Sequence, residues 1–368
     1  MTMNRNNYKR LGDYVRLVDV RNRDLAVTNL LGVSISKMFI PSIANTIGTD
    51  MSTYKIVEPY QFAYGPVTSR NGDKITFALY KGAEKCIISS AYITFEVIDK
   101  EKLDPDYLMM WALRPEFDRY ARFMSNGSAR EIFSWDDMCE VYLPIPDINE
   151  QRRIVAEYQA VEKRIATNEA LIVKLEETAK AIYKKMFLND VDPENLPFGW
   201  HWGSITEIAR LKVGGDKPKV FSDEITNECS VPVYANGTDD EGIFGYTDRA
   251  SVTGRCITIT ARGTIGCCFF RKTPFVPIVR LIVVQPLKEC YDYYLFHNLA
   301  FANLQGDGSV QSQLTVPQLQ MIKILIPSED SAAEFHCKVE PLDEHVDLLK
   351  KENSKMREVL ELFLSKMS

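Results

Sequence analysis

Apolar side chains recur at helical spacing through the middle of the chain. Residues 148–187 contain no glycine or proline, and positions separated alternately by four and three residues carry Ile154, Tyr158, Val161, Ile165, Asn168, Ile172, Leu175, Ala179, Ile182 and Met186. This alternation is the a/d seam of a heptad repeat, which lies on one face of a helix. The pattern therefore predicts one long coiled-coil helix, whose seam needs a partner helix to cover it.

A second seam with the same spacing lies near the C-terminus. It consists of Phe335, Val339, Leu342, Val346, Leu349, Asn353, Met356, Leu360, Phe363 and Met367, each 181 residues after its counterpart in the first seam. The same offset relates Phe133 to Leu314 and Met138 to Leu319. A constant offset across seams and flanks predicts a tandem duplication, in which each unit is a globular domain followed by a long helix.

The two seams predict how the helices pair. If a pseudo-two-fold axis relates the halves, the helices run antiparallel, with Ile154 opposite Met367. Asn168 then lies opposite Asn353, so that the two polar breaks meet and fix the register by hydrogen bonding. The alternative is that each asparagine faces solvent where the seam drifts.

The expected fold class is α+β, with a twisted antiparallel sheet in each globular domain. We expect four segments: globular domain 1 (1–147), a central long helix (148–190), globular domain 2 (191–327) and a C-terminal long helix (328–368). Within them the sequence predicts strands at 75–80 and 90–97, helices at 105–122 and 292–300, and a correspondence in kind between 85–97 and 255–270. Pro341 removes a backbone donor from the second long helix, where we expect a kink or a late helix start.

Composition and charge narrow the class of protein. The 368 residues carry a net charge of −6, which divides as −1, +1, −2 and −4 over the four segments. A nucleic-acid binder of this composition must therefore use a local basic patch. No apolar run approaches membrane-spanning length, and the N-terminus lacks a signal sequence. The eight cysteines form no CxxC pair, so a reducing cytoplasm is the expected compartment.

Motifs for catalysis are missing from the sequence. There is no phosphate-binding GxxxxGK[ST] loop, no Asn-Pro-Pro-Tyr-type methyltransferase motif and no metal pattern among the four histidines. The Pro-Asp pair at 146–147 stands where a helix begins, so that Asp147 or Asn149 is better interpreted as its N-cap. We expect no catalytic residue, no metal and no cofactor in this chain.

The chain resembles a known family, the specificity subunits of type I restriction–modification enzymes. The phrases that carry the resemblance are NEQRRIV (149–155), VGGDKPK (213–219), VPVYANGTDDEGIFGYTD (231–248), TARGTIGCCFF (260–270), SQLTVPQLQMIKILIP (312–327), YGPVTSRNGDKITFALYKG (64–82) and ISSAYITFEV (88–97). Their order, the duplication and the paired seams support the resemblance more strongly than any single phrase does.

The resemblance implies a function for each segment. Each globular domain would be a target-recognition domain that reads one half of a bipartite site in double-stranded DNA. The paired helices would set the gap between the halves and dock two methyltransferase subunits, which hold S-adenosylmethionine and methylate adenine. Two motor–nuclease subunits that use ATP and Mg can join such a complex. The chain itself would be non-catalytic.

Candidate DNA-binding residues come from loops that mix basic and amide side chains, because Arg and Lys contact phosphate or guanine and Asn and Gln read adenine. In globular domain 1 the candidates are Arg70, Asn71, Lys74, Lys37 and Arg130. In globular domain 2 they are Lys212, Lys217, Lys219, Asn236, Arg249, Arg262, Arg271, Lys272, Gln311 and Gln313. For each residue, the alternative is a solvated surface or turn position.

Two other functions stay open from the sequence. One is the specificity subunit of a fused nuclease–methyltransferase system, which would differ only in its partners. The other is a scaffold whose coiled coil holds two protein-binding domains, a function that the acidic net charge favours and the basic loops oppose.

Overall fold

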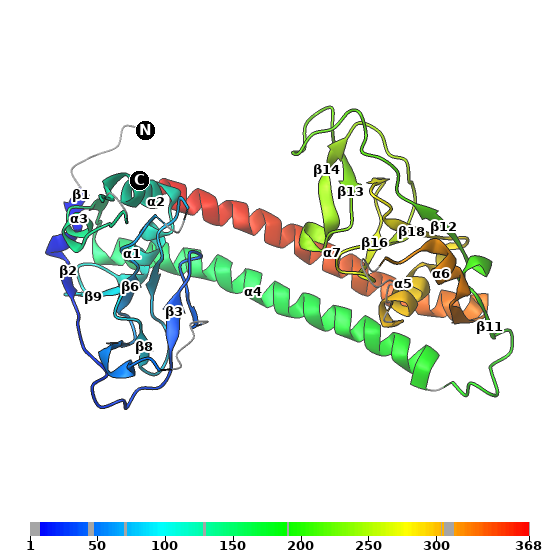
Figure 1. Cartoon of the computed structure of the whole chain (residues 1–368), viewed down its shortest axis with the longest axis horizontal. Helices are drawn as coiled ribbons and strands as arrows, with labels where there is room; N and C mark the ends of the chain where they lie inside the picture. Colours follow the sequence, from blue (N-terminus) through cyan, green and yellow to red (C-terminus); the bar gives the residue numbers. More distant parts are fainter. Residues whose placement is uncertain are drawn as a thin grey trace. The chain divides into compact units, whose positions relative to one another are not determined.

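The chain divides into two compact units, each of which contains one globular domain and part of both long helices (Figure 1). Unit 1 comprises residues 1–167 and 352–368, and unit 2 comprises residues 168–351. The computed structural model describes residues 8–42, 48–69, 72–127, 130–189, 191–302, 304 and 313–367.

Unit 1 is built on a four-stranded antiparallel sheet in the order β2-β9-β6-β7. Its strands are β2 (Val15–Leu17), β9 (Ile93–Val97), β6 (Phe62–Tyr64) and β7 (Phe77–Leu79). Side chains alternate between the two faces of a strand, so Phe62 and Tyr64 enter the main core of the unit while Ala63 enters a second core. Phe62 stacks on Phe95 of the neighbouring strand, with ring centroids 4.9 Å apart.

Short pairs of strands complete the β structure of unit 1. They are β1 (Tyr8–Arg10) with β10 (Tyr142–Pro144), β3 (Leu31–Val33) with β4 (Phe39–Pro41), and β5 (Lys55–Val57) with β8 (Cys86–Ile88).

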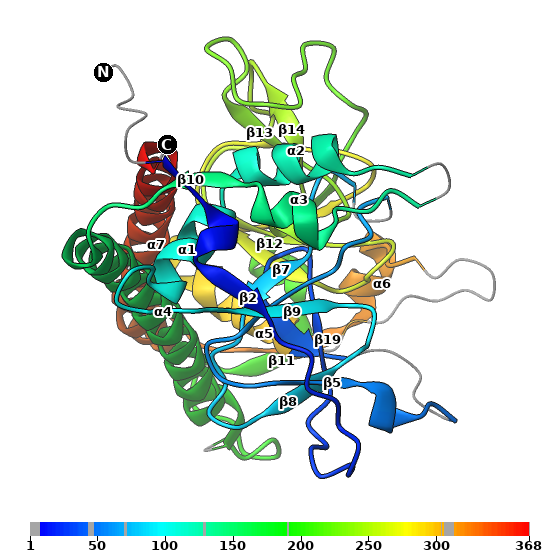
Figure 2. The ribbon, with the colours of Figure 1, turned by 90° about the vertical axis from the view of Figure 1, so that its left-hand side faces the viewer.

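Helices α1 (Pro105–Ala112), α2 (Pro115–Met124) and α3 (Trp135–Cys139) complete unit 1. The prediction of one helix over 105–122 was wrong. Pro115 disfavours helical geometry at the preceding residue, and Arg114 adopts an extended conformation with ψ of 138°. The chain therefore breaks there and restarts with Pro115 in the first turn of α2, while α1 lies beside the long helix α4 (Ile148–Lys184) in both views (Figures 1 and 2).

Unit 2 repeats the same topology. Its four-stranded sheet has the order β12-β18-β15-β16, formed by β12 (Ala209–Val213), β18 (Ile282–Pro286), β15 (Cys256–Ile259) and β16 (Cys268–Arg271). A two-stranded pair joins β11 (His201–Ser204) to β19 (Lys323–Ile326), and a smaller sheet has the order β14 (Ile243–Thr247), β13 (Val231–Tyr234), β17 (Val276–Pro277). Helices α5 (Asp292–Phe301) and α6 (Val316–Met321) complete the unit, and α5 matches the helix predicted at 292–300.

The matching strand orders confirm the duplicated α+β fold. The predicted correspondence of 85–97 with 255–270 was wrong, because the counterpart of β15 and β16 by sheet position is β6 and β7. The 181-residue offset therefore does not hold throughout the globular domains, since the loops between strands differ in length.

The two long helices run antiparallel. In unit 1, Ile154 and Tyr158 near the start of α4 share a core with Met367 at the end of α7 (Glu329–Lys366). In unit 2, the end of α4 packs on the start of α7, where the ring of Phe335 lies 5.9 Å from that of Tyr183. Every residue of both predicted seams is buried or half-buried.

The asparagines of the two seams are buried. Asn168 and Asn353 are each 2% exposed, which contradicts the alternative that they face solvent. They belong to different units, so the hydrogen bond between them stays a prediction. Buried amides of this kind need hydrogen-bond partners, since an unpaired one would cost about 1–3 kcal/mol.

The ends of the long helices follow from local signals. The backbone N–H of Asn149 donates to Asp147 Oδ1 over 3.1 Å, which confirms Asp147 as the N-cap of α4. A π-helical turn, Lys185–Asn189, closes that helix. The expected late start of the second helix was wrong, because α7 begins at Glu329 and continues through Pro341. Among the described residues, no helix combines the length and apolar character needed to cross a membrane.

Candidate nucleic-acid interface

The turn between β15 and β16 in unit 2 brings several predicted DNA-binding residues together. Arg262 is exposed in this turn and donates to Gln313 Oε1 over 3.1 Å. The neighbouring Ala261 accepts a backbone hydrogen bond from Leu314, so the turn and the segment before α6 are held side by side. Arg262 and Gln313 therefore form one polar surface, whereas Gln311 lies outside the described residues.

Asn236 supports this surface. Its side-chain Nδ2 donates to the carbonyl of Val279 over 2.7 Å, and its Oδ1 accepts from the backbone N–H of Ala261 over 2.6 Å. Both ends of the amide thus bond to the backbone of this chain. Asn236 holds the turn in place rather than offering its amide to an adenine.

A second basic surface of unit 2 is a hollow of about 520 Å³ that Lys219 and Arg249 share. The Arg249 side chain is 91% exposed and lies 3.7 Å from Asp248. Lys217 is exposed in the same loop, with its ammonium 3.4 Å from the ring centroid of Phe221. Lys212 is exposed on β12, an edge strand of the sheet. These four cations remain available for phosphate or base contacts.

Arg280 was missed by the sequence analysis. It is exposed in the turn between β17 and β18, where Val279 and Arg280 both have positive φ values, 51° and 62°. Such angles are uncommon outside glycine, and for the β-branched Val279 they are a strained outlier. The strained turn is the same one that Asn236 braces, so Arg280 presents a cation next to the Arg262 turn. No turn-forming residue in the sequence signals it.

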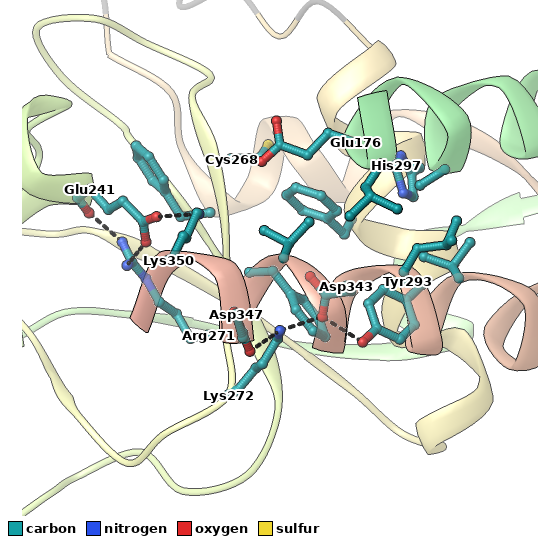
Figure 3. A pocket seen from close by; sticks show the side chains of 18 of the residues that line it. Glu176, Glu241, Cys268, Arg271, Lys272, Tyr293, His297, Asp343, Asp347 and Lys350 are labelled. Carbon is teal, nitrogen blue, oxygen red and sulfur yellow. Dashed lines mark hydrogen bonds and ion pairs between the residues drawn. The ribbon is translucent and has the colours of Figure 1, made fainter. Parts of the chain in front are cut away.

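Arg271 and Lys272 were predicted to bind DNA, and the structure places both against other parts of unit 2 (Figure 3). Arg271 is 4% exposed and donates to Thr258 Oγ1 over 3.0 Å and to Glu241 Oε2 over 3.2 Å. Its guanidinium lies 3.6 Å from the ring centroid of Tyr234, and burial lowers the pKa of Arg271. This cation belongs to the interior.

Lys272 is held by the long helix α7. Its ammonium forms ion pairs with Asp343 and Asp347, the latter over 2.6 Å. Burial alone would lower the pKa of Lys272, but hydrogen bonds to the two carboxylates raise it overall. The sequence analysis missed this role because the two carboxylates lie about 70 residues further along the chain. A pair of basic residues after a strand has the same local sequence whether it faces DNA or a neighbouring helix.

In unit 1, the predicted residues Lys37 and Lys74 line one hollow of about 420 Å³. Lys74 is exposed, but the Lys37 side chain is 5% exposed and its ammonium lies 2.9 Å from Asp118 Oδ1. Lys37 also donates to the carbonyl of Ala112 over 2.5 Å, and burial lowers its pKa. Lys37 therefore forms the floor of the hollow and is not a free phosphate contact.

Two further cations on the rim of this hollow were missed, Arg119 and Arg122 of α2. They project from the same side of the helix at a spacing of three residues, and Arg122 forms an ion pair with Glu131. Arg130 is exposed beside Glu131. The predicted residues Arg70 and Asn71 lie outside the described residues.

The histidines and acids of the described residues show no metal-binding arrangement. No group of three or more His, Cys, Asp or Glu side chains is placed there to hold a metal ion. The most perturbed histidine, His297, is 4% exposed, and burial lowers its pKa to about 4. It is therefore neutral at physiological pH and packs between aromatic rings.

Comparison with known proteins bears on both units. The family model described as "Type I restriction modification DNA specificity domain" matches the chain twice, over residues 34–177 and 197–357. A Mycoplasma pneumoniae protein named "Putative type I specificity subunit S.MpnORF507P" is 27% identical over 222 residues, which cover 60% of this chain and 60% of that protein. A second protein from the same organism, S.MpnORF89P, is 36% identical over 137 residues, which cover 37% of this chain and 41% of that protein. The chain thus spans about 60% or less of the length of these relatives.

Solved structures show the same fold. A type I restriction–modification S subunit from M. genitalium superposes with a TM-score of 0.62 at 16% identity, covering 100% of this chain and 98% of that chain. A chain from a structure of type I restriction–modification complex assembly superposes with a TM-score of 0.50 at 16% identity, covering 98% of this chain and 96% of that one.

Proposed function

We propose a function on the premise that this chain belongs to the family of type I restriction modification DNA specificity domains, whose model matches both of its units. The chain is the DNA-reading subunit of a type I restriction–modification complex. Each globular domain reads one half of a bipartite, asymmetric site in double-stranded DNA. The observation that carries this proposal is the repeated topology, because two reading domains of one fold and different surfaces suit two different half-sites.

The basic surfaces support a DNA partner. In unit 2, Arg262 and Arg280 flank the braced turn, while Lys219 and Arg249 share the second hollow. In unit 1, Lys74 lies with Arg119 and Arg122 around one hollow. Loops of this kind give an acidic protein local positive potential, and exposed arginines can read guanine in the major groove. We therefore assign base and phosphate contacts to these loops.

The long helices serve as spacer and as docking surface in this proposal. The 37 residues of α4 correspond to about 55 Å at the helical rise. Half-sites one helical turn apart on DNA lie about 34 Å from centre to centre, which a spacer of this length accommodates. The same helices dock two methyltransferase subunits, and a motor–nuclease pair can join them.

The chemistry belongs to the partner subunits. Methyl transfer to adenine uses S-adenosylmethionine held by the methyltransferase subunits, and ATP and Mg act on the motor subunits. The chain contributes recognition: it selects the site and orients the complex on it. The family match and the exposed basic loops favour this function over a scaffold for two protein partners.

Sequencing of methylated adenine tests the proposal. The chain is co-expressed with its methyltransferase subunit in cells that lack other adenine methylation, and the genome is sequenced for the modified base. We expect one motif with two short blocks separated by a fixed gap. Steep loss of DNA affinity with rising salt should accompany it, because phosphate contacts release counterions. An assembled complex that binds S-adenosylmethionine but methylates no specific motif would contradict the proposal.

A further inference from the structure

A row of charged side chains runs along α7 beside its apolar seam. It comprises His336, Glu340, Asp343, Asp347 and Lys350, each one position after a seam residue and separated by four, three, four and three residues. Residues at this spacing lie along one side of a helix. Each of the five interacts with a charged side chain of the globular domain of unit 2.

Lys272 makes the central contact of this row (Figure 3). It follows β16 directly and bridges Asp343 and Asp347, which are one helical turn apart. Asp343 also accepts a hydrogen bond from the hydroxyl of Tyr293 on α5 over 2.7 Å. The Lys272 and Asp343 side chains are 25% and 26% exposed, so the contact is partly shielded from solvent and stronger than a surface pair.

Arg255 makes a second contact one turn away. It precedes β15 directly and donates to Glu340 Oε1 over 2.6 Å and to Asp292 Oδ2 over 3.2 Å. The buried Asp292 in turn lies 2.8 Å from Nδ1 of His336. The row of charges on α7 therefore holds both strands of the β15–β16 hairpin.

The β15–β16 hairpin is held to α7 at one end and carries its turn at the other. Cys256 pairs with Arg271, so Arg255 and Lys272 stand together at the open end of the hairpin. The turn at the other end carries Arg262, the exposed candidate for base contacts. Each strand has four residues, or about 13 Å of length. Because the two strands are paired over their whole length, movement of the hairpin at the end near α7 also displaces Arg262 in the turn.

Unit 1 anchors its equivalent hairpin differently. By strand register, β6 and β7 correspond to β15 and β16, and Lys81 stands where Lys272 stands in unit 2. Lys81 forms an ion pair with Asp106 of α1. It also lies near Glu162 of α4, the counterpart of Asp343: burial raises the pKa of Glu162, and the charge of Lys81 opposes that rise. At the 181-residue offset, three α4 counterparts of the charged row are uncharged: Val155, Gln159 and Ala166. Lys81 thus lies near one acidic side chain of α4, whereas Lys272 bridges two carboxylates of α7, and the row carries a charged or ionisable side chain at all five positions in unit 2 but at two of five in unit 1.

We propose that Lys272 and Arg255 are positioning residues, which fix the β15–β16 hairpin to α7 and thereby set how strictly the second globular domain reads its half of the DNA site. The inference rests on the proposed function and adds to it a specificity determinant that does not touch DNA. Losing the Lys272 contact leaves two facing carboxylates on α7 and frees the open end of the hairpin. Reading of the second half-site becomes permissive, while reading of the first half-site does not change.

The test compares methylation at near-cognate sites. Lys272→Met, Lys272→Arg and the wild-type chain are each co-expressed with the methyltransferase subunit, and methylation is counted at sites with one base changed in either block. Lys338→Met is the matched control, because Lys338 forms its ion pair with Glu334 on α7 itself. We expect Lys272→Met to raise methylation of sites changed in one block about tenfold, because a loosely held hairpin penalises a mismatched base less. Sites changed in the other block should keep the wild-type level.

A matched variant keeps the test valid if Lys272→Met folds poorly. The triple variant Lys272→Met, Asp343→Asn, Asp347→Asn removes the contact without leaving unpaired charge, and it should show the same one-sided loss of fidelity. Lys272→Arg should retain wild-type fidelity, because arginine keeps the positive charge and a side chain of similar length. Equal loosening of both blocks, or none in either variant, would overturn the inference while leaving the proposed function intact. A wild-type chain without a bipartite motif would instead overturn the proposed function on which the inference rests.

Discussion

Units 1 and 2 share a sheet order but attach to the long helices through different chemistry. In unit 1, the buried polar element of the contact is Gln151, which bonds the backbone of two loops, and the ion pair of Arg152 with Glu101 lies exposed at the surface. In unit 2, the counterpart of Gln151 is the buried Ala332, and ion pairs from Lys272 and Arg255 secure the globular domain to α7. Duplication thus conserved the fold while the two attachments diverged.

The difference indicates which properties can vary in each half. Buried hydrogen bonds such as those of Gln151 are screened little by salt, whereas the partly exposed ion pairs of unit 2 respond to salt and to neighbouring titrating groups. All four histidines lie in unit 2, which adds to the asymmetry. Changes of salt or pH should therefore alter the second half of the molecule before the first.

The largest expected effect comes from the aromatic cluster under α7 in unit 2. Phe335 is fully buried, and its ring lies 5.2 Å from Phe187 and 5.6 Å from His297. Phe335→Ala should lower the free energy of unfolding of unit 2 by about 4 kcal/mol, through lost burial and a cavity. The seam counterpart Ile154 is half-buried, so Ile154→Ala should destabilise unit 1 by about half as much. Hydrogen exchange resolved by peptide separates the two units, and equal losses would contradict the comparison.

Gln151 offers the next test, on the unit 1 side. Its Oε1 accepts from the backbone N–H of Asp104 over 2.8 Å, and its Nε2 donates to the carbonyls of Lys102 and Pro146. Gln151→Leu keeps most of the volume but strands these buried backbone groups, at a cost of about 3 kcal/mol. The loss should appear as faster hydrogen exchange in residues 102–107 of unit 1. Unchanged protection of this segment would show that water replaces the side chain.

The third effect depends on pH and is confined to unit 2. Burial lowers the pKa of His297 to about 4, so between that pH and the ordinary histidine pKa the unfolded chain binds a proton that the folded chain does not. Stability is therefore lost as pH falls through this window, by about 2.5 kcal/mol at pH 4.5. His297→Phe should flatten this dependence relative to the wild-type chain, because no buried imidazole is then left to take up a proton on unfolding. Urea unfolding between pH 7 and 4.5 measures both chains, and an unchanged slope in His297→Phe would contradict the assignment.

The smallest expected effect concerns a surface ion pair between the long helices in unit 1. Arg164 Nε lies 3.2 Å from Glu352 Oε1, but the side chains are 57% and 41% exposed. Arg164→Met should change stability by about 0.5 kcal/mol or less, because solvent screens the pair. A loss in Tm beyond that of a neutral surface variant such as Lys163→Met would mean that charge contributes to the pairing of the long helices in unit 1 as well.

The comparison also shows which features of the molecule a sequence predicts well. The seams were predicted residue by residue, because heptad periodicity is local and each seam position repeats at a fixed offset. For the globular domains the sequence predicted the α+β class but not the order of the strands, since strand order depends on pairings between distant segments. Pro115 itself indicates the break between α1 and α2, but the apolar residues on both sides continue a helical pattern and led to the prediction of one helix.

The roles of the basic residues could not be predicted from the sequence. Lys37, Lys74, Lys272 and Arg262 look alike in the sequence, as cations near turns. The structure divides them by partners that lie far along the chain: Asp118 for Lys37 and Asp343 with Asp347 for Lys272. Arg119 and Arg280 were missed because one lies on a helix and the other in a strained turn without glycine. Loop composition alone does not tell an exposed cation from one that anchors a domain.

The central claim is that two equivalent units read two halves of one site. Its most direct test is a symmetric chain in which residues 8–186 replace residues 202–367, joined at β-pairs that correspond in the two units, Tyr8 with Pro144 and Trp202 with Leu325. Both reading domains are then identical. In the second helix, Asn168→Leu and Ile172→Asn restore the side chains of Leu349 and Asn353, so that the two seams keep their antiparallel register. Sequencing of methylated adenine should give a palindromic motif, the first block of the wild-type site followed by its inverted copy. A folded complex that still methylates the asymmetric wild-type motif would contradict the claim.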